Sequence, residues 1–583
     1  MFEYKVISSL DELSHITTGD ETFADIETDG LYINTRLIQV YQPATNEQIV
    51  YIIDTDIVDL DEAKEFLKPL WTIWHNASYD LGTLNIVTAK IDDTLYLVKS
   101  AYPEWQQFGL DVAISKLGWN KLYDGIDKKS MQKGGFVKGA YLSARQLKYS
   151  ATDVYALAQI WKNKRVQATR ELLAYKVDIL ALRDVIVWQQ NGIPVLPDIY
   201  EQYYSKALAE KEEFLASLPD GLNPRSPKQV KELLNTDSSD KPTLMRKYIN
   251  EGVKVAGDIL KARKALNDIS KLNQFRYPRV YGRFNPAGAV TGRWTCKGGD
   301  MIAGTNLQNY PRQFKGIFGV KPDSDSILVT ADYSTAELRA AASIYKEPAM
   351  YKALKDGKDL HKFTASMIYG IPIEEVQGRQ RSNAKVANFG FAFGLSAKTF
   401  VTYAFDLYNL KFTLEEAQAL KDKWFKAYPN IAKYHKMCWN EMSKPSTYIC
   451  KTALGRRIAP KLGTDAINAP VQGSIAETMK LAIYYMSKEN KDVLKYIINS
   501  VHDSIYLLVP EAEAKYWGDL VKRNMIKGWE ELSKTPLMYY KDIPMPIDVA
   551  YGKTMTDLAD DFEGGGQALS IEEMEALNAL KEK

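Results

Sequence analysis

Acidic residues near the N-terminus have the spacing of metal ligands. Asp25 and Glu27 follow an apolar stretch that reads as a strand end, and side chains two residues apart on a strand point to the same side. Two carboxylates held together repel each other unless a cation lies between them, which favours a hard divalent metal ion with oxygen ligands. The alternative is a pair of solvated surface acids, and a lone Asp-x-Glu does not separate the two.

Two further segments add groups of the same kind. Asp80 lies at an expected helix start, after His75 and Asn76. Tyr149 and Asp153 are four residues apart in a helical pattern, so they share one helix face. A tyrosine and an aspartate on one face can orient a water molecule and complete a metal site.

A second acidic pair lies far along the chain. Residues 326–331 form a buried-strand pattern that ends at Asp332, where a helix N-terminal cap is the alternative role. Two apolar strands, 496–500 and 505–509, flank a short polar turn and predict a hairpin with Asp503 at its tip. A carboxylate buried there is costly unless it is paired or bound to a metal ion.

Between these acids, Arg381, Lys385 and Phe389 fall on one face of an expected helix, and Gly390 is expected to break it. Two cations and an aromatic ring suit a nucleoside triphosphate, because the charges match the phosphates and the ring matches the base. The alternative is a solvated basic face with one core phenylalanine.

The C-terminal segments resemble motifs A, B and C of family A DNA polymerases, the group of bacterial DNA polymerase I and many phage replicases. Motif A matches 332–339, motif B matches 381–394, and motif C matches His502-Asp503. Thr291-Gly292-Arg293, Asp359-Leu360-His361 and 468–473 also match, in family order. The N-terminal acids resemble the 3′→5′ exonuclease domain of the DEDDy type.

The resemblance implies a multidomain chain of α/β and α+β class. An RNase H-like exonuclease domain would span 1–165, and a right-hand polymerase domain 166–558. Within the latter, the thumb would cover about 190–280, the palm about 281–350 and 456–558, and the fingers about 351–455. We expect residues 559–583 to form an acidic linker and a short tail helix, which either folds back on the core or docks a replisome partner.

Template-directed DNA synthesis with 3′→5′ proofreading is the implied activity, with two Mg²⁺ ions in each site and Mn²⁺ as the alternative ion. The implied partners are primer–template DNA and dNTPs. Asp332, Asp503 and the Tyr333 backbone would hold the polymerase ions, with Lys385 as general acid toward pyrophosphate. The remaining implied residues are, for the dNTP, Arg381, Lys385, Phe389, His361 and Glu337; for primer–template, Arg293, Asn468, Gln472, His502 and Phe393; and for the exonuclease, the ligands Asp25, Glu27, Asp80 and Asp153 with Tyr149 positioning water.

The sequence departs from the family pattern in motif C and motif B. Motif C usually carries a second acid, and Ser504 stands in its place. Phe393 replaces the usual tyrosine, and Phe389 implies discrimination against dideoxynucleotides. The compact plan resembles phage replicative polymerases more than the bacterial repair enzyme.

Bulk properties restrict the setting of this activity. The net charge is +2 with 25% charged residues, so any positive charge that binds DNA must be local. The three cysteines form no CxxC pair, and neither a secretory signal nor an apolar run of membrane-spanning length is visible. We expect a cytoplasmic protein, in the host cytoplasm if it is viral, that does not enter a membrane.

Two other hypotheses stay open at this point. A single-subunit RNA polymerase shares parts of this palm, although the exonuclease motifs and Glu337 argue against it. Because Ser504 replaces an acid, a DNA-binding or exonuclease-only protein with a decayed polymerase site is the second alternative.

Overall fold

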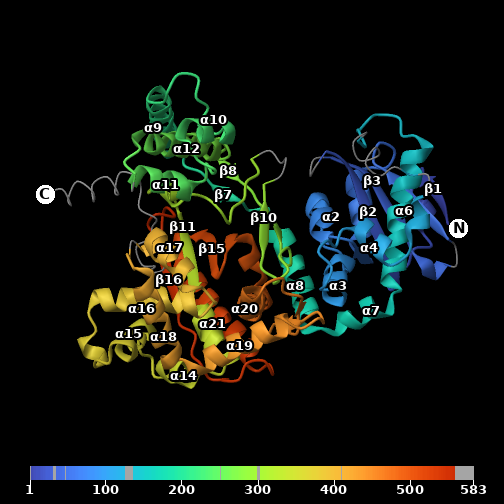
Figure 1. Ribbon diagram of the computed structural model, residues 1–583. Helices are drawn as coiled ribbons and strands as arrows, with labels where there is room; N and C mark the ends of the chain where they lie inside the picture. Colours follow the sequence, from blue (N-terminus) through green and yellow to red (C-terminus); the bar gives the residue numbers. More distant parts are fainter. Residues whose placement is uncertain are drawn as a thin grey trace.

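The computed structural model describes residues 2–30, 34–45, 48–124, 126, 135–249, 251–298, 303–408 and 410–558. Figure 1 shows an N-terminal lobe, drawn in blue and cyan, beside a larger body in green, yellow and red. Two helices, α7 (Lys164–Gln167) and α8 (Leu173–Trp188), connect them. The linker and tail helix expected over 559–583 lie outside the described residues.

The N-terminal lobe is built on a six-stranded mixed sheet, with strands β1 (Glu3–Ile7), β2 (Glu21–Asp29), β3 (Asn34–Tyr41), β4 (Ile49–Asp54), β5 (Trp71–Trp74) and β6 (Lys90–Asp93). Their order in the sheet is β1-β4-β3-β2-β5-β6, and β3 alone runs antiparallel to both neighbours. Apolar residues alternate with Asp25 and Glu27 along β2, so the sheet buries one side of this strand. The lobe's helices are α1 (Leu60–Leu67), α2 (Ala77–Leu84), α3 (Thr94–Ala101), α4 (Leu110–Lys116) and α6 (Ala144–Trp161), the last of which packs on β2, β3 and β4.

Four helices form a lobe in the part of the chain where the thumb is predicted. They are α9 (Pro197–Ala216), α10 (Pro227–Leu234), α11 (Lys241–Ile249) and α12 (Lys254–Leu272). Helix α12 packs against both α9 and α11. The lobe has a hydrophobic core of its own that includes Val230, Leu244 and Ile259, separate from the main core of the protein.

A four-stranded antiparallel sheet lies in the larger body, with strands β11 (Ser326–Tyr333), β14 (Ile497–Val501), β15 (Ser504–Pro510) and β16 (Ile547–Gly552). Their order is β14-β15-β11-β16, which brings segments more than 170 residues apart in sequence side by side. Two long helices, α20 (Gly463–Glu489) and α21 (Ala514–Ser533), pack on each other, and α21 also contacts β11 and β16. Short strands complete the body: β7 (Ile193–Pro194), β8 (Arg279–Val280), β9 (Arg283–Asn285), β10 (Thr295–Lys297), β12 (Cys450–Lys451) and β13 (Arg457–Ile458).

Seven helices fill the stretch between β11 and β12, namely α13 (Ala336–Ile344), α14 (Pro348–Lys355), α15 (Leu360–Tyr369), α16 (Gly378–Phe391), α17 (Ala397–Tyr408), α18 (Leu414–Ala427) and α19 (Pro429–Met442). The predicted break at Gly390 is wrong, because α16 continues to Phe391. Glycine favours close packing there, since a Cβ atom would lie only 3.0 Å from the Phe400 ring. The left-handed residue comes later, at Gly394 with φ of 88°.

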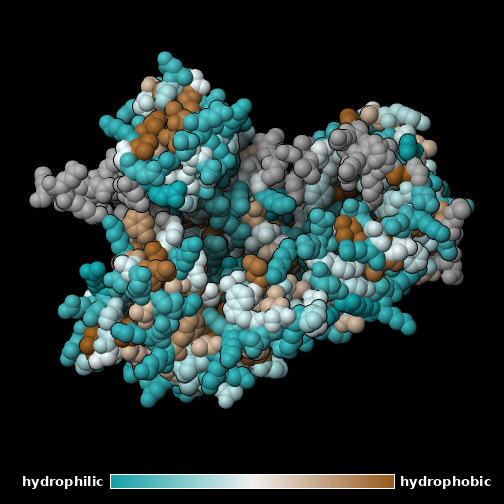
Figure 2. Space-filling model, viewed as in Figure 1, coloured by the Kyte–Doolittle hydropathy of each residue, from teal (hydrophilic) through white to brown (hydrophobic). Residues whose placement is uncertain are grey.

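The molecular surface is mostly hydrophilic on the face shown in Figure 2, and a recess lies below the lobe formed by α9–α12. Among the described residues, no helix combines the length and the apolar character that a bilayer crossing requires.

Candidate active sites

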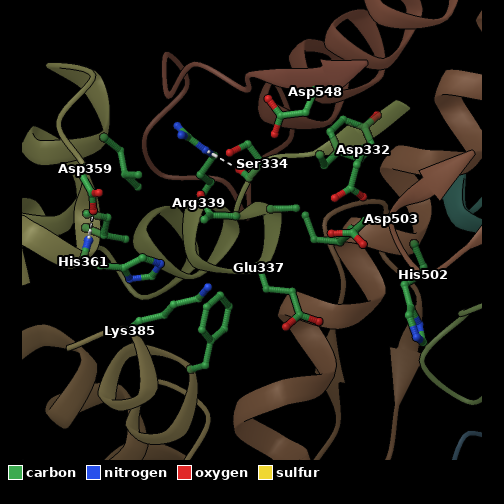
Figure 3. A pocket seen from close by; sticks show the side chains of 18 of the residues that line it. Asp332, Ser334, Glu337, Arg339, Asp359, His361, Lys385, His502, Asp503 and Asp548 are labelled. Atoms are coloured by element: carbon green, nitrogen blue, oxygen red, sulfur yellow. Dashed lines mark hydrogen bonds between the residues drawn. The ribbon is translucent and has the colours of Figure 1, made fainter. Parts of the chain in front are cut away.

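Two acids predicted as metal ligands meet at one edge of the antiparallel sheet. Asp332 lies near the end of β11 and pairs in register with Ser504 at the start of β15. The Ser504 hydroxyl donates a hydrogen bond to Asp332 Oδ1 at 2.8 Å. His502 occupies the turn between β14 and β15 with a left-handed φ of 54°, and this turn directs Asp503 toward Asp332 (Figure 3).

The electrostatics of this pair favour a cation. Burial, followed by the charges of Asp332 and Glu337, raises the pKa of Asp503 to about 8. Burial also raises the pKa of Asp332, and a hydrogen bond from Ser504 offsets part of that effect. Two partly buried carboxylates that disfavour each other's charge are suited to hard divalent ions, which accept oxygen ligands and remove the repulsion.

The acids open into a cavity of about 1050 Å³. Asp332 and Asp503 lie on one side of it and Lys385 lies on another (Figure 3). Arg381 and Phe389, which are on the same helix as Lys385, also line the cavity. The structure therefore brings the acids and the cations that the sequence singled out together around one cavity.

Glu337 and Arg293, predicted to contact different substrates, form an ion pair with each other beside this cavity. The pair is about one-third exposed, so it contributes little to stability. Its effect is to fix the position of the Glu337 carboxylate at the cavity wall.

The α16 face is held by an acid that caps the neighbouring helix. Asp359 accepts hydrogen bonds from the backbone of His361 and Lys362 at the start of α15. Its other carboxylate oxygen accepts from Arg381 Nε at 2.8 Å. One side chain therefore fixes the start of α15 and the orientation of the Arg381 guanidinium.

His361 lies at the cavity wall as a neutral donor. The Trp424 indole donates to Asn388 Oδ1 at 2.9 Å, so Asn388 Nδ2 faces His361 Nδ1 at 3.0 Å and donates to it. The proton of the neutral ring is therefore on Nε2. Burial, together with the charges of Arg381 and Lys385, lowers the pKa of His361 to about 4.

The resemblance implies that His361 contacts the triphosphate of the dNTP, so replacing it with leucine should lower kcat/KM for dNTP incorporation by about 10-fold or more, because a hydrogen bond to a charged phosphate would be lost. His361→Gln keeps a donor and should lose less. Single-nucleotide incorporation kinetics measure both effects. With a pKa of about 4, the parent profile should show no step from this imidazole between about pH 6 and 8. If the pH profile of the parent shows a step in this range and His361→Gln removes it, the interpretation of His361 as a neutral donor is wrong.

The residues predicted to contact primer–template divide between two places. Arg293 and His502 line the cavity, with His502 exposed. Asn468 and Gln472 lie on α20, where Asn468 Nδ2 donates to the Phe393 carbonyl at 3.3 Å. Asn468, Gln472 and Phe393 are not among the residues that line the cavity.

A buried ionic network supports the loop that carries Arg293. Asp178 on α8 accepts two hydrogen bonds of 2.7 Å from Arg456 and one of 2.6 Å from Lys480. Lys480 also donates to the Gly292 carbonyl at 2.7 Å. Gly292 has φ of 82°, and a Cβ atom there would lie 2.3 Å from Arg456 Nε, so only glycine fits against the network.

The N-terminal lobe holds a second acidic cluster. Ligand atoms of Asp25, Glu27 and Asp153 all lie within 4.8 Å of one another. Strand β2 supplies the first two and α6 supplies the third. Asp80 on α2 is buried beside Asp25, whose charge adds to burial in raising the Asp80 pKa. Asp80 is not part of the close group of three in the described residues.

Two tyrosines contact this cluster. Tyr149, one helical turn before Asp153, has its pKa raised by burial and then by the charges of Asp153 and Glu27. The Tyr123 hydroxyl donates a hydrogen bond to Asp153. The sequence predicted Tyr149 and missed Tyr123, because nothing in the spacing of residue 123 connects it to the acidic motifs.

Sequence reasoning also missed Asp548, Asn388 and the role of Asp359. Asp548 lies on β16 next to Asp332 and lines the cavity. A signal existed for Asp548, since residues 546–553 resemble the closing strand of family A DNA polymerases and Asp548 is the acid within that segment. Asn388 is fully buried and carries no spacing signal.

Comparison with known proteins identifies the family. Residues 198–557 match the model of DNA polymerase family A. The DNA polymerase I of Aquifex aeolicus is 30% identical over 580 residues, which cover 92% of this chain and 95% of that protein. The chain belongs to DNA polymerase family A. The DNA polymerase I of Mycobacterium leprae is 30% identical over 298 residues, 47% of this chain and 30% of that protein.

The fold agrees with this membership. The solved POL domain of Pol1 from M. smegmatis, in complex with DNA primer–template and dNTP, superposes with a TM-score of 0.72. The match covers 94% of this chain and 98% of that chain. At 22% identity, it shows that the two chains share a fold. The predicted right-hand polymerase fold of mixed α/β composition is confirmed.

Proposed function

We propose that this family A DNA polymerase copies a DNA template from dNTPs with Mg²⁺ and removes mispaired 3′ ends with a 3′→5′ exonuclease in its N-terminal lobe. The observation that carries synthesis is the convergence of Asp332 and Asp503 opposite Arg381 and Lys385 around one cavity. The observation that carries editing is the cluster of Asp25, Glu27 and Asp153. The relatives compared are bacterial, so a phage-type replicative role stays a prediction of the resemblance.

In synthesis, Asp332, Asp503 and the Tyr333 backbone would hold the divalent ions. When bound, two such ions activate the primer 3′-OH and stabilise charge on the leaving pyrophosphate. Arg381 and His361 Nε2 bind the triphosphate oxygens. Lys385 Nζ gives a proton to the departing pyrophosphate.

Selection of the nucleotide rests on the opposite wall. Phe389 stacks on the base of the incoming nucleotide, and its ring lies 5.7 Å from the His361 ring. Glu337, fixed by Arg293, crowds the sugar 2′ position and excludes ribonucleotides. Asn468, Gln472 and Phe393 lie outside the cavity lining, and we assign them to the duplex beyond the primer terminus.

In editing, Asp25, Glu27, Asp80 and Asp153 hold the ions, and Tyr149 orients the attacking water. Tyr123 shares the Asp153 carboxylate with Tyr149 and keeps it in place. Raised tyrosine pKa values keep both hydroxyls protonated, so each acts as a hydrogen-bond donor.

Editing is tested with a primer whose 3′ end is mispaired. With Mg²⁺ and no dNTPs, the parent should shorten the primer, whereas Asp25→Ala/Glu27→Ala should do so about 1,000-fold more slowly, because ligands of ions that contribute several kcal/mol are lost. With dNTPs, the parent should trim and then extend, and the variant should stall. Extension of a paired primer by both proteins is the control. A parent that leaves the mispaired end intact would contradict the editing half of the proposal.

A further inference from the structure

A row of three polar side chains crosses the sheet at the polymerase site. Residues directly opposite each other in an antiparallel sheet point to the same face, with Cβ atoms about 4.5–5.5 Å apart. Asp332 is opposite Ser504 on one neighbouring strand and opposite Asp548 on the other. All three therefore lie side by side on one face of the sheet, in the order Ser504, Asp332, Asp548, and the two acids line the cavity.

Ser504 and Asp548 have different relations to the central acid. The Ser504 hydroxyl donates to Asp332 Oδ1 and so supplies no negative charge. Asp548, by contrast, offers a second carboxylate directly opposite Asp332 on the neighbouring strand, and both acids line the same cavity. Figure 3 shows Asp548 beside Asp332 on the side away from Asp503.

The Asp548 carboxylate is exposed, and within the part of the chain that the structure describes it makes no hydrogen bond or ion pair. Its charge favours the charged form of Arg339, whose Nε donates to the Ser334 carbonyl at 2.9 Å and whose Nη1 donates to the Pro544 carbonyl at 2.6 Å. An exposed carboxylate next to a partly buried one costs stability unless a ligand compensates.

We propose that Asp548 supplies the third carboxylate of the polymerase metal site, in place of the acid that Ser504 lacks. This inference rests on the proposed function of the site. In this arrangement Asp548 and Asp332 lie on one face of the sheet, and Asp503 lies at the tip of the hairpin. Asp332, in the middle, would be a neighbour of both other carboxylates. More negative charge around the site raises its affinity for divalent cations.

The test measures metal binding directly. Mn²⁺ is titrated into the full chain and the free ion is followed by electron paramagnetic resonance. The background is Asp25→Ala/Glu27→Ala, which removes two ligands of the other cluster. Asp548→Asn is expected to weaken Mn²⁺ binding by about 10-fold or more, the usual effect of removing a group that supports a metal site. Asp323→Asn, an equal change of charge at an exposed residue outside the cavity, should leave it unchanged.

Equal Mn²⁺ affinity in Asp548→Asn and its background would overturn the proposal, as would the absence of any Mn²⁺ site in that background. A second arm adds Ser504→Glu to Asp548→Asn, which returns a carboxylate to the row on the other side of Asp332. Mn²⁺ binding by this double variant should recover. If it stays as weak as in Asp548→Asn alone, a carboxylate at position 504 does not substitute for Asp548, which counts against the proposal.

Activity separates this inference from the proposed function. The Mg²⁺ concentration for half-maximal primer extension should rise about 10-fold in Asp548→Asn, with recovery at high Mg²⁺. If the parent extends primers and Asp548→Asn has the same Mg²⁺ requirement, only this inference fails. If the parent extends no primer with any divalent ion, the proposed function itself fails.

Discussion

Asp503→Asn should lower primer extension about 1,000-fold or more while 3′-end degradation continues. Asparagine keeps the shape of the side chain at the hairpin tip but loses the charge that holds the ions. Metal ions contribute several kcal/mol to phosphoryl transfer, and about 4 kcal/mol corresponds to 1,000-fold. Gel-based rates with a paired primer and all four dNTPs measure the loss, and degradation without dNTPs is measured on the same preparation.

The fold should tolerate this change. With its pKa raised to about 8, Asp503 is largely neutral near pH 7 in the absence of a cation, so asparagine replaces it with a side chain of the same charge and similar shape. The thermal midpoint of Asp503→Asn in the presence of a chelator should therefore be no lower than that of the parent. Retained extension would mean that these acids do not carry the chemistry, and simultaneous loss of both activities would indicate misfolding instead.

Local patterns predicted the elements that carry the sites well. The strand before Asp332, the hairpin around Asp503 and the helix of Tyr149 all occur, because period-two and helical spacing report burial directly. Gly390 was misjudged because a glycine within a helix can serve close packing on Phe400 as well as a break.

Contacts between distant segments could not be predicted from the sequence. No local pattern pairs residue 332 with both 504 and 548, because register across a sheet depends on the whole fold. The resemblance supplied Asp332 and Asp503, and it covered Asp548 within the closing strand without giving this acid a role. Asn388 was equally hidden, since its effect on His361 requires Trp424 from another helix to fix its amide.

The buried network under the Arg293 loop was also invisible, since its members are spread over 300 residues. Asp178, Arg456, Glu477 and Lys480 are each at most 5% exposed. Two acids and two bases balance there, and burial still lowers the pKa of Lys480 to about 8. Such a network does not stabilise a fold by itself, but removing one partner leaves the remaining charges buried and uncompensated, which is strongly destabilising.

Asp178→Asn should lower the free energy of unfolding by about 3–5 kcal/mol, because it leaves Arg456 and Lys480 buried with only Glu477 to balance them. The shift of the urea midpoint relative to the parent measures the loss. Lys480→Met restores the charge balance, so the double variant should lose less than Asp178→Asn alone. Because Lys480 also holds the Gly292 carbonyl, the double variant should regain stability while extending primers more slowly than the parent. A double variant that is as unstable as Asp178→Asn would show that side-chain shape, rather than charge balance, determines stability at this site. A double variant that extends primers at the parental rate would show that the network does not support the function of the Arg293 loop.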